Sequence, residues 1–287
     1  MGRWWNALIL LLATAVGVVA FASPFLSASG FQGAATAAHA ADAPFLTLAL
    51  TVICLVVVVA SLMGGMMHAR TVALLGILSA VNAVLRAVPG PAGFSAIFFL
   101  LVLCGHTYGA TFGFLLGSLS ILVSALLGAG VGPWLPFQMF TAGWVGLSSG
   151  WLPRLRKYPR FELWMLAAWG ALWGLVFGAI MNLWFWPYIA GVGAAEGTYW
   201  EPGIGLAATA RRYLAFYVLT SLWWDLWRAG GNTVLILLLG RPLLRVLRRF
   251  ERVLRFERNA VGAAVSAHPT DAVESLVSAP CQSARHG

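Results

Sequence analysis

The sequence predicts an all-α polytopic membrane protein whose helices cross the bilayer eight times. Hydrophobic residues make up 60% of the 287 residues and charged residues only 9%, whereas soluble domains carry about a quarter charged residues. The mean hydropathy is +0.84. Apolar segments long enough to cross a bilayer alternate with short polar segments, and basic residues gather in two of these, at 153–160 and 241–258. These observations exclude a soluble fold.

Each predicted span is an apolar run that ends at a charge or at a turn rich in Gly and Pro. The third run ends at 89–91, and the Gly-Val-Gly-Pro-Trp-Leu-Pro segment at 130–136 separates the fifth run from the sixth. Residues 5–21 could also be a cleaved signal peptide, because small residues at 20 and 22 resemble a cleavage site, but we expect an uncleaved span. The expected spans are residues 5–21, 45–63, 71–88, 92–108, 110–129, 135–152, 161–188 and 212–240.

The charged residues also predict how the eight spans are oriented. With both termini in the cytoplasm, the loops at 64–70 and 153–160 and the C-terminal tail face inward and carry most of the Lys and Arg. We therefore expect a multi-pass plasma-membrane protein, in contact with lipid and not with nucleic acid. The acids of the outer loops are Asp42, Glu196 and Glu201, and the basic exceptions are Arg86, Arg211 and Arg212.

The basic run after the last span has the pattern of an amphipathic helix. It predicts either a helix along the cytoplasmic leaflet or a continuation of the last span toward the cytoplasm. The chain after Asn259 is only weakly polar, without a clear hydrophobic period, and is expected to be disordered.

The sequence lacks the motifs of nucleotide hydrolysis and of common hydrolases. The G-x-x-x-x-G-K-[ST] phosphate loop is absent, and the only lysine is Lys157. The H-E-x-x-H and G-x-S-x-G motifs are absent too, as is a pair of Asp-rich segments that would hold magnesium diphosphate. Cys54, Cys104 and Cys281 do not have the spacing of metal ligands. We therefore predict no catalytic residue, no metal site and no cofactor.

Polar residues within the spans predict a binding pocket that faces outward. A charge near the bilayer centre costs about 2.5 kcal/mol or more, so such residues should face protein or a cavity. Most of them fall in the outer half of the membrane beside aromatic residues, which suits a flat or ring-bearing ligand of little or no charge. The candidate residues are Asn82, Arg86, Trp134, Gln138, Asn182, Trp186, Tyr217, Asp225 and Arg228.

These residues also have plainer interpretations. Asn82 and Asn182 could form hydrogen bonds between helices that serve packing alone. Asp225 and Arg228, three residues apart on one helix, could form an ion pair that only fixes packing. His106, in the cytoplasmic half of its span, is expected to be structural.

Small residues recur along one face of the third span. They allow the backbone of another helix, in this chain or in another one, to approach closely. This face is therefore a candidate contact with a partner subunit. Its residues are Ala69, Ala73, Gly76 and Ala80.

Two segments, at 73–86 and 113–150, resemble the substrate-binding (S) component of energy-coupling factor (ECF-type) ABC transporters. The resemblance covers about residues 69–245. It implies an S-component-like core of six helices at 67–245, two additional transmembrane helices within 1–66, and a basic segment and tail at 246–287. Its most specific residues lie in the turn and are Gly132, Pro133, Trp134, Pro136, Gln138 and Met139.

The resemblance also implies a function. Such a component binds a vitamin or related small molecule from outside, and it works with a transmembrane coupling subunit and two ATPase subunits. The small-residue face of the third span would meet the coupling subunit, and the whole component would topple in the membrane to deliver its ligand. The turn looks most like the cobalamin-type branch, which suggests a corrinoid such as cobalamin.

Two other functions stay open from the residues alone. The chain could be a membrane enzyme that acts on a lipid or isoprenoid through Asp225 and Arg228. It could also be a standalone secondary carrier, although the sequence shows no internal repeat of the kind that many carriers contain.

Overall fold

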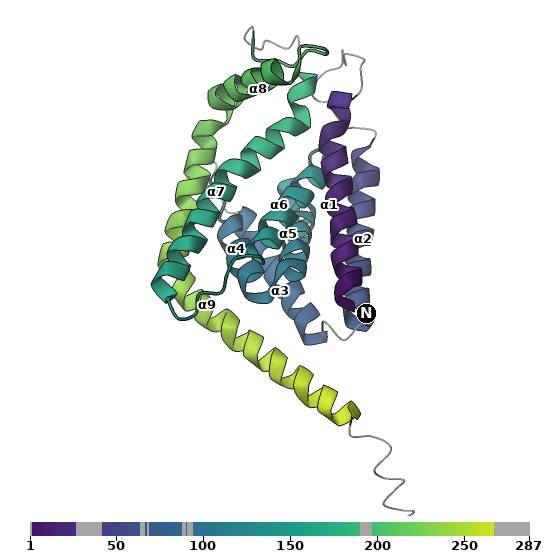
Figure 1. Cartoon of the computed structure of the whole chain (residues 1–287), viewed down its shortest axis with the longest axis vertical. Coiled ribbons are helices and arrows are strands. Elements are labelled where there is room, and N and C mark those ends of the chain that lie inside the picture. The colour runs from purple at the N-terminus through teal and green to yellow at the C-terminus, as the bar shows by residue number, and fades with distance from the viewer. Residues whose placement is uncertain are drawn as a thin grey trace, which may run out of the picture.

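The computed structural model describes residues 2–26, 42–63, 67, 69–87, 90, 94–189 and 197–266, and in these residues every regular element is a helix (Figure 1). Six helices are long and apolar enough to cross a membrane, so the predicted all-α polytopic class is confirmed. They are α1 (Gly2–Leu26), α2 (Ala43–Met63), α3 (Ala69–Ala87), α5 (Ala110–Ser124, continued by a π-helix at Ala125–Ala129), α7 (Pro159–Phe185) and α9 (Leu222–Ser266). Glu196 and the end of the predicted disordered tail, from 267, lie outside the described residues.

The bundle has two ends that differ in what they carry. Helix α8 (Leu206–Thr220) lies across one of them, where α1 also ends, and we call this the α8 end (top of Figure 1). The opposite end holds the loop at 153–158 and the lower part of α9, both rich in arginine, and we call it the basic end.

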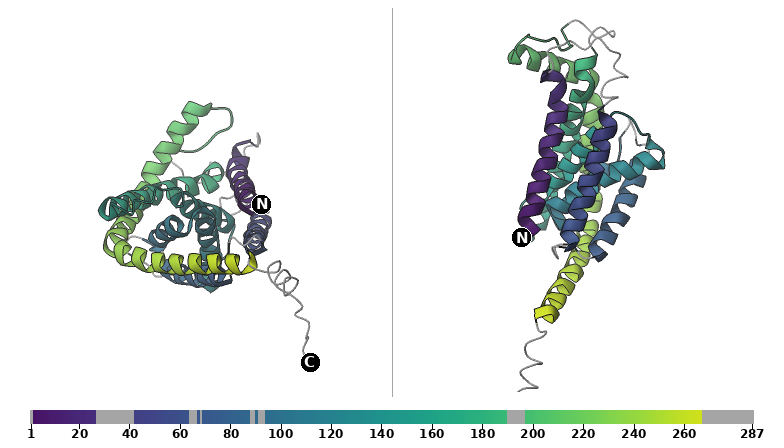
Figure 2. Two further views of the ribbon diagram at one scale, coloured as in Figure 1. Left: turned by 60° about the horizontal axis from the view of Figure 1, so that its bottom comes forward. Right: turned by 90° about the vertical axis from the view of Figure 1, so that its right-hand side faces the viewer.

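The two additional helices, α1 and α2, lie side by side along one flank of the bundle (Figures 1 and 2). Helix α1 lies directly against α6 (Leu135–Ser149), because a Cβ atom on Gly17 would come within 2.8 Å of the Phe140 and Trp144 rings. The Phe21 ring also packs edge-on against Phe137, with 4.9 Å between ring centroids. The buried side chains of α2 recur at helical spacing and are Ala43, Leu50, Cys54, Val57 and Ser61.

The centre of the bundle contains two helices that are shorter than predicted. Helix α4 (Ile97–Tyr108) has 12 residues and α6 has 15, fewer than the roughly 20 that cross a bilayer. The predicted span at 92–108 is thus shortened, since 94–96 are not helical. Every α4 residue up to Thr107 is buried, so neighbouring helices, and not lipid, surround this helix.

Helices α4, α5 and α6 touch through their backbones. A Cβ atom on Gly146 would lie 2.1 Å from the carbonyl oxygen of Gly113, and one on Gly117 would lie 2.1 Å from that of Ala142. A Cβ atom on Gly105 of α4 would lie 2.2 Å from the carbonyl oxygen of Gly146. Side chains at these positions would not fit, so glycine sets how closely the three helices pack.

Helix α7 packs on α9 through a second row of glycines. Gly170, Gly174 and Gly178 recur every four residues and face α9. A Cβ atom on Gly174 would lie 2.6 Å from the Cα atom of Ala229, and one on Gly178 would overlap the Asp225 carboxylate. This row was not noticed in the sequence, although its spacing is visible there.

Helix α9 also caps α4. The Asn232 side chain accepts a hydrogen bond from the backbone N–H of Phe99 at 2.8 Å and donates one to the Arg228 carbonyl at 2.8 Å. Because Phe99 lies in the first turn of α4, its N–H has no partner within that helix. A side chain of another helix therefore satisfies it inside the bundle.

The predicted eighth span at 212–240 is wrong at its start. Helix α8 and helix α9 are separate, joined at Ser221, and only α9 qualifies as a span, beginning at residue 222. The Asn182 amide donates to the Ser221 hydroxyl at 2.7 Å and holds the bend. Arg211 and Arg212 lie on α8, and charges are costly within a bilayer. The helix that carries them is therefore turned across the end of the bundle (Figure 1).

At its other end, α9 continues far beyond the predicted span. It runs unbroken to Ser266, through Pro242 and through the predicted division at 245. Of the two alternatives for the basic segment, the continuation of the last span is the one that forms. Within 241–253 the buried residues are Leu244, Leu247 and Glu251, while Arg245, Arg249 and Arg252 are exposed.

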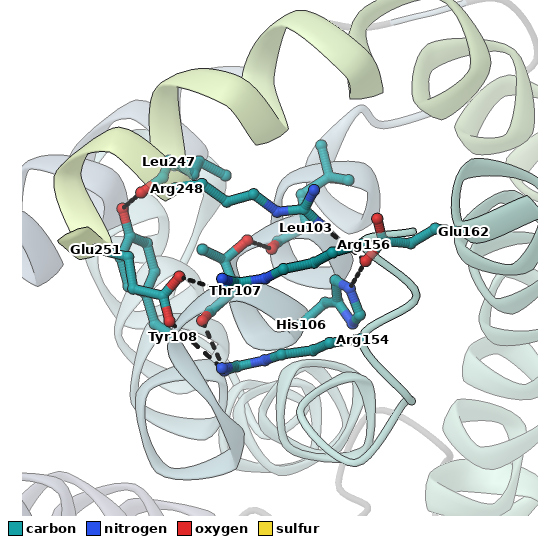
Figure 3. A network of polar contacts seen from close by, with 10 residues as sticks. All are labelled: Leu103, His106, Thr107, Tyr108, Arg154, Arg156, Glu162, Leu247, Arg248 and Glu251. Carbon is teal, nitrogen blue, oxygen red and sulfur yellow. Dashed lines mark hydrogen bonds and ion pairs between the residues drawn. The ribbon is translucent and has the colours of Figure 1, made fainter. Parts of the chain in front are cut away.

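A buried carboxylate joins α4, α7 and α9 at the basic end (Figure 3). Glu162 of α7 is only 1% exposed, and it accepts a hydrogen bond from Arg248 of α9 at 2.6 Å. The same oxygen lies 2.8 Å from His106 Nε2 of α4. Removing one partner of such a buried charge group is typically costly, so these contacts fix the three helices together.

A second carboxylate fastens the loop at 153–158 to α9 (Figure 3). Glu251 lies 3.3 Å from a guanidinium nitrogen of Arg154 and 3.1 Å from one of Arg156. Arg154 also donates to the carbonyl of Thr107, at the end of α4, at 2.8 Å. Every arginine named in this network therefore has an acidic partner.

We predict that Gly146→Ala lowers the free energy of unfolding by about 1–3 kcal/mol, because the methyl group would force α5 and α6 apart. Gly230→Ala is the matched control. It lies on the exposed side of α9 with no atom within 4 Å, so alanine should be neutral or stabilising by up to about 1 kcal/mol. Thermal unfolding of the purified protein in detergent measures both. Equal stability of the two variants would contradict the backbone contact.

Candidate ligand-binding site

A cluster of polar side chains joins α3, α5 and α6. Arg86, in the last turn of α3, donates from Nη2 to Gln138 Oε1 at 2.6 Å and from Nη1 to Ser124 Oγ at 2.5 Å. Ser124 is the last residue of α5, and Gln138 lies in the first turn of α6. We call these three residues the Arg86 cluster. They lie toward the α8 end, since the turn between α5 and α6 adjoins the start of α2.

The turn between α5 and α6 brings Ser124 and Gln138 to the same level. Gly128 and Gly130 have φ angles of 116° and 89°, in a region that side chains with a Cβ atom rarely adopt. Pro136 then lies in the first turn of α6, where its missing N–H leaves no hydrogen bond unmade. The sequence of the turn thus determines which residues face Arg86.

Trp134 lies in the same turn, and its carbonyl accepts a hydrogen bond from the backbone N–H of Gln138 at 3.0 Å. Its ring covers Gly132, where a Cβ atom would lie 2.4 Å from it. It meets the Trp184 ring of α7 edge-to-face, with centroids 6.4 Å apart, and remains 37% exposed. The Trp134 and Trp184 rings therefore form an aromatic contact between the start of α6 and α7.

The charge of Arg86 has no acidic partner in the described part of the chain. Both hydrogen-bond acceptors, Ser124 and Gln138, are neutral, and no described carboxylate lies within 4 Å. A guanidinium group has five N–H donors, of which these contacts use two. The side chain is half-buried, and no nitrogen of Arg86 is among the buried side-chain atoms without a partner in the described residues.

Asn82 lies one helical turn before Arg86 on the same face of α3. It is 0% exposed, and neither its Oδ1 nor its Nδ2 has a hydrogen-bond partner among the described residues. Ser79, one turn further, has an unpartnered buried hydroxyl as well. The expected hydrogen bond from Asn82 to another helix is therefore not formed. Leaving a buried amide without a hydrogen bond costs about 1–3 kcal/mol of folding free energy. Asn82 therefore places an unsatisfied polar group inside the bundle.

Asp225 and Arg228 lie elsewhere, in the contact between α7 and α9. Asp225 is 1% exposed, forms an ion pair with Arg228, and fits beside Gly178. The Arg228 guanidinium lies 5.5 Å from the centroid of the Phe177 ring and 6.0 Å from that of Phe98. The carboxylate of this ion pair is therefore buried in the contact between α7 and α9, whereas the Arg228 side chain stays 22% exposed.

The other three predicted residues hold the α8 end together. Asn182 supports the bend between α8 and α9, and the Tyr217 hydroxyl of α8 donates to the Leu175 carbonyl of α7 at 3.4 Å. Trp186 is 1% exposed, and its Nε1 donates to the Thr198 carbonyl at 2.9 Å. All three contacts are explained by the packing of α7 and α8.

The predicted residues thus form separate groups. The structure bonds Arg86 to Gln138, with Asn82 one helical turn before Arg86 and Trp134 one turn before Gln138, while the Asp225–Arg228 pair belongs to another helix contact. Sequence reasoning missed Ser124, because the spans contain many serines. Its position directly before the glycine-rich turn, opposite Gln138, was the available signal.

Two apolar grooves lie on the flank that α1 and α2 cover. One, of about 650 Å³, is lined by Leu10, Thr14, Trp144 and Trp173 among others. The other, of about 460 Å³, lies between the start of α2 and residues 131–133. Neither includes the Arg86 cluster, and their linings suit hydrocarbon chains. The described residues contain no group of three His, Cys, Asp or Glu side chains placed to hold a metal ion.

Comparison with known proteins agrees with this architecture. The model of the family described as "ECF transporter, substrate-specific component" matches residues 70–240, which is more than half of the chain. No curated protein and no solved structure gives a significant match. The matched region begins at α3 and ends within α9, so it contains the Arg86 cluster and leaves out α1 and α2. The chain belongs to the family of substrate-specific components of ECF transporters.

Proposed function

We propose that this chain captures a vitamin-like small molecule at the outer face of the plasma membrane and delivers it to an ATP-driven importer. The observation that carries the proposal is the Arg86 cluster, in which three helices of the family region direct polar groups to one place. Both termini would then lie in the cytoplasm. A corrinoid such as cobalamin is the first candidate ligand, because the turn at 132–139 looks like the cobalamin-type branch.

The proposed partners are a transmembrane coupling subunit and two ATPase subunits. The chain has no phosphate loop, so energy from ATP would have to come from other subunits. The small-residue face of α3 supports this proposal, because it is not covered by α1 and α2. Its residues Ala69, Ala73, Gly76 and Ala80 are all exposed, and no atom lies within 4 Å of a Cβ position on Gly76.

Two competing functions are less well supported. A membrane enzyme that used Asp225 and Arg228 would need these groups to reach a substrate, whereas Asp225 is buried against α7 and paired with Arg228. A standalone carrier would need no partner, whereas α3 leaves an uncovered face for one. Uptake assays with and without an energising module separate these functions. Uptake by the chain alone, driven by an ion gradient, would refute the proposal.

We predict that Gln138→Ala weakens ligand binding by about 1–3 kcal/mol, because it removes a hydrogen-bonding group and frees the Arg86 side chain that it orients. Isothermal titration calorimetry with the ligand that co-purifies with the protein measures the change. Thr141→Ala, one turn further along α6 and bonded within its own helix to the Phe137 carbonyl, is the control. Unchanged affinity of Gln138→Ala would remove this residue from the site.

We predict that Gly76→Leu abolishes ATP-dependent uptake and leaves ligand affinity within about twofold of wild type. The isolated subunit has open space at Gly76, so the larger side chain would obstruct only a partner helix. Val84→Leu, at a 56% exposed position elsewhere on α3, is the control and should retain uptake. Equal loss of binding and uptake in Gly76→Leu would indicate misfolding and not a lost partner contact.

A further inference from the structure

We infer that the ligand captured at the Arg86 cluster carries an oxyanion, a carboxylate or a phosphate, which pairs with the Arg86 guanidinium. The inference rests on the proposed function, because it specifies the charge of the ligand that the subunit would capture. It replaces the expectation of a ligand with little or no charge, which was drawn from polar residues beside aromatic ones.

The charge balance of the described residues singles out Arg86. Four of their arginines are at least partly buried, and three of these have an acidic partner within 4 Å. Arg212 pairs with Glu201 at 3.0 Å, Arg228 pairs with Asp225, and Arg248 pairs with Glu162. Arg86 is the fourth and has only neutral partners. A charge removed from water without a counter-ion is costly, so an anion from outside the chain would stabilise this site.

The direction of the side chain favours a ligand over the surrounding lipid. Arg86 turns toward α5 and α6, where its two acceptors lie. The face of α3 that is exposed at the same depth is apolar, with Val81 46% and Val84 56% exposed. An arginine that reached for lipid headgroups would extend along that face, away from the helix contacts.

The geometry of the remaining donors fits an oxyanion. Ser124 and Gln138 each take one N–H from a different terminal nitrogen of Arg86, which fixes the plane of the guanidinium. Three of its five N–H groups stay available. Paired N–H groups of one guanidinium bind carboxylates and phosphates with two parallel hydrogen bonds. The cluster is thus a preformed half of an ion pair.

One test needs no ligand. The protein and two variants, Arg86→Gln and Arg228→Gln, are purified in a neutral detergent, washed free of small molecules and melted. Arg86→Gln removes an uncompensated charge, so its melting temperature should equal or exceed that of the wild type. Residues kept for binding often lower stability, and replacing them commonly restores it. Arg228→Gln leaves Asp225 unpaired and should unfold several degrees lower. A similar loss of stability in Arg86→Gln would make Arg86 a structural residue and overturn the inference.

A second test uses compounds that differ only in charge. Nicotinate and nicotinamide, pantothenate and pantothenyl alcohol, and biotin and its primary amide are compared by thermal stabilisation. Cyanocobalamin and cobinamide, which lacks the whole nucleotide loop with its phosphodiester, form a less closely matched pair that tests the corrinoid candidate. At least one acidic member should stabilise the wild type more than its neutral partner. Arg86→Gln should lose affinity for it by roughly 10- to 100-fold, and Arg86→Lys should lose less.

Three outcomes of the second test would overturn the inference. In the first, a neutral member binds the wild type as well as its acid does. In the second, Arg86→Gln binds the acid with unchanged affinity. In the third, phosphatidylglycerol stabilises the wild type and not Arg86→Gln, while no soluble acid does so, which would assign the anion to a lipid headgroup. Failure of the proposed function would give a different result. The acidic ligand would still bind in an Arg86-dependent manner, but the chain would take it up without any ATPase subunit.

Discussion

Contact between helix backbones is the constraint on which the rest of this bundle depends. At the α5–α6 crossing, Gly113 and Gly146 bring carbonyl groups and Cα atoms together where any side chain would intervene. The glycines of α7 do the same for α9, and Gly178 leaves the space that the Asp225 carboxylate occupies. In a membrane, where lipid removes most of the hydrophobic drive between helices, such close packing supplies much of their attraction. The geometry of these helix crossings then determines where the polar side chains of the bundle lie.

The arrangement of charge follows from that framework. At the basic end, Glu162 pairs with a histidine of α4 and an arginine of α9, Glu251 pairs with arginines of the loop at 153–158, and in the α7–α9 contact Asp225 pairs with Arg228. These carboxylates make the bundle rigid without leaving reactive groups exposed. Arg86 departs from this pattern, because its neighbours orient it and leave its charge uncompensated. A position that is well oriented and poorly neutralised is what a binding site for an anion requires.

Much of the fold could be predicted from the sequence, because hydropathy alone marks segments that must leave water. The all-α class and six of the spans follow from it. The start of the last span could not be predicted so simply, since α8 is apolar enough to pass for part of a membrane helix. Arg211 and Arg212, counted as exceptions to the charge rule, were the residues that marked the error.

Only part of the candidate site could be predicted, because its residues come from helices far apart in the sequence. Arg86 and Gln138 are 52 residues apart, and the glycine-rich turn suggested a polar position near the membrane face. Spacing along single helices cannot show which residues of different helices meet. The sequence therefore grouped Asp225 and Arg228 with Arg86, although in the structure they lie beside the glycine row of α7, in the contact between α7 and α9. The partnerless amide of Asn82 could be found only once its surroundings were known.

The continuity of α9 has a mechanical consequence. A single helix of 45 residues begins at the Ser221 bend and passes the ion pairs of Arg248 and Glu251 on its way out of the bundle. An α-helix resists stretching along its axis because backbone hydrogen bonds close its turns, and in α9 the missing N–H of Pro242 interrupts this series within the helix. A shift of α8 when the opposite end is still fixed would therefore load the arginine–carboxylate contacts directly. Helix α9 therefore connects the α8 end of the bundle mechanically with the end that carries the arginines.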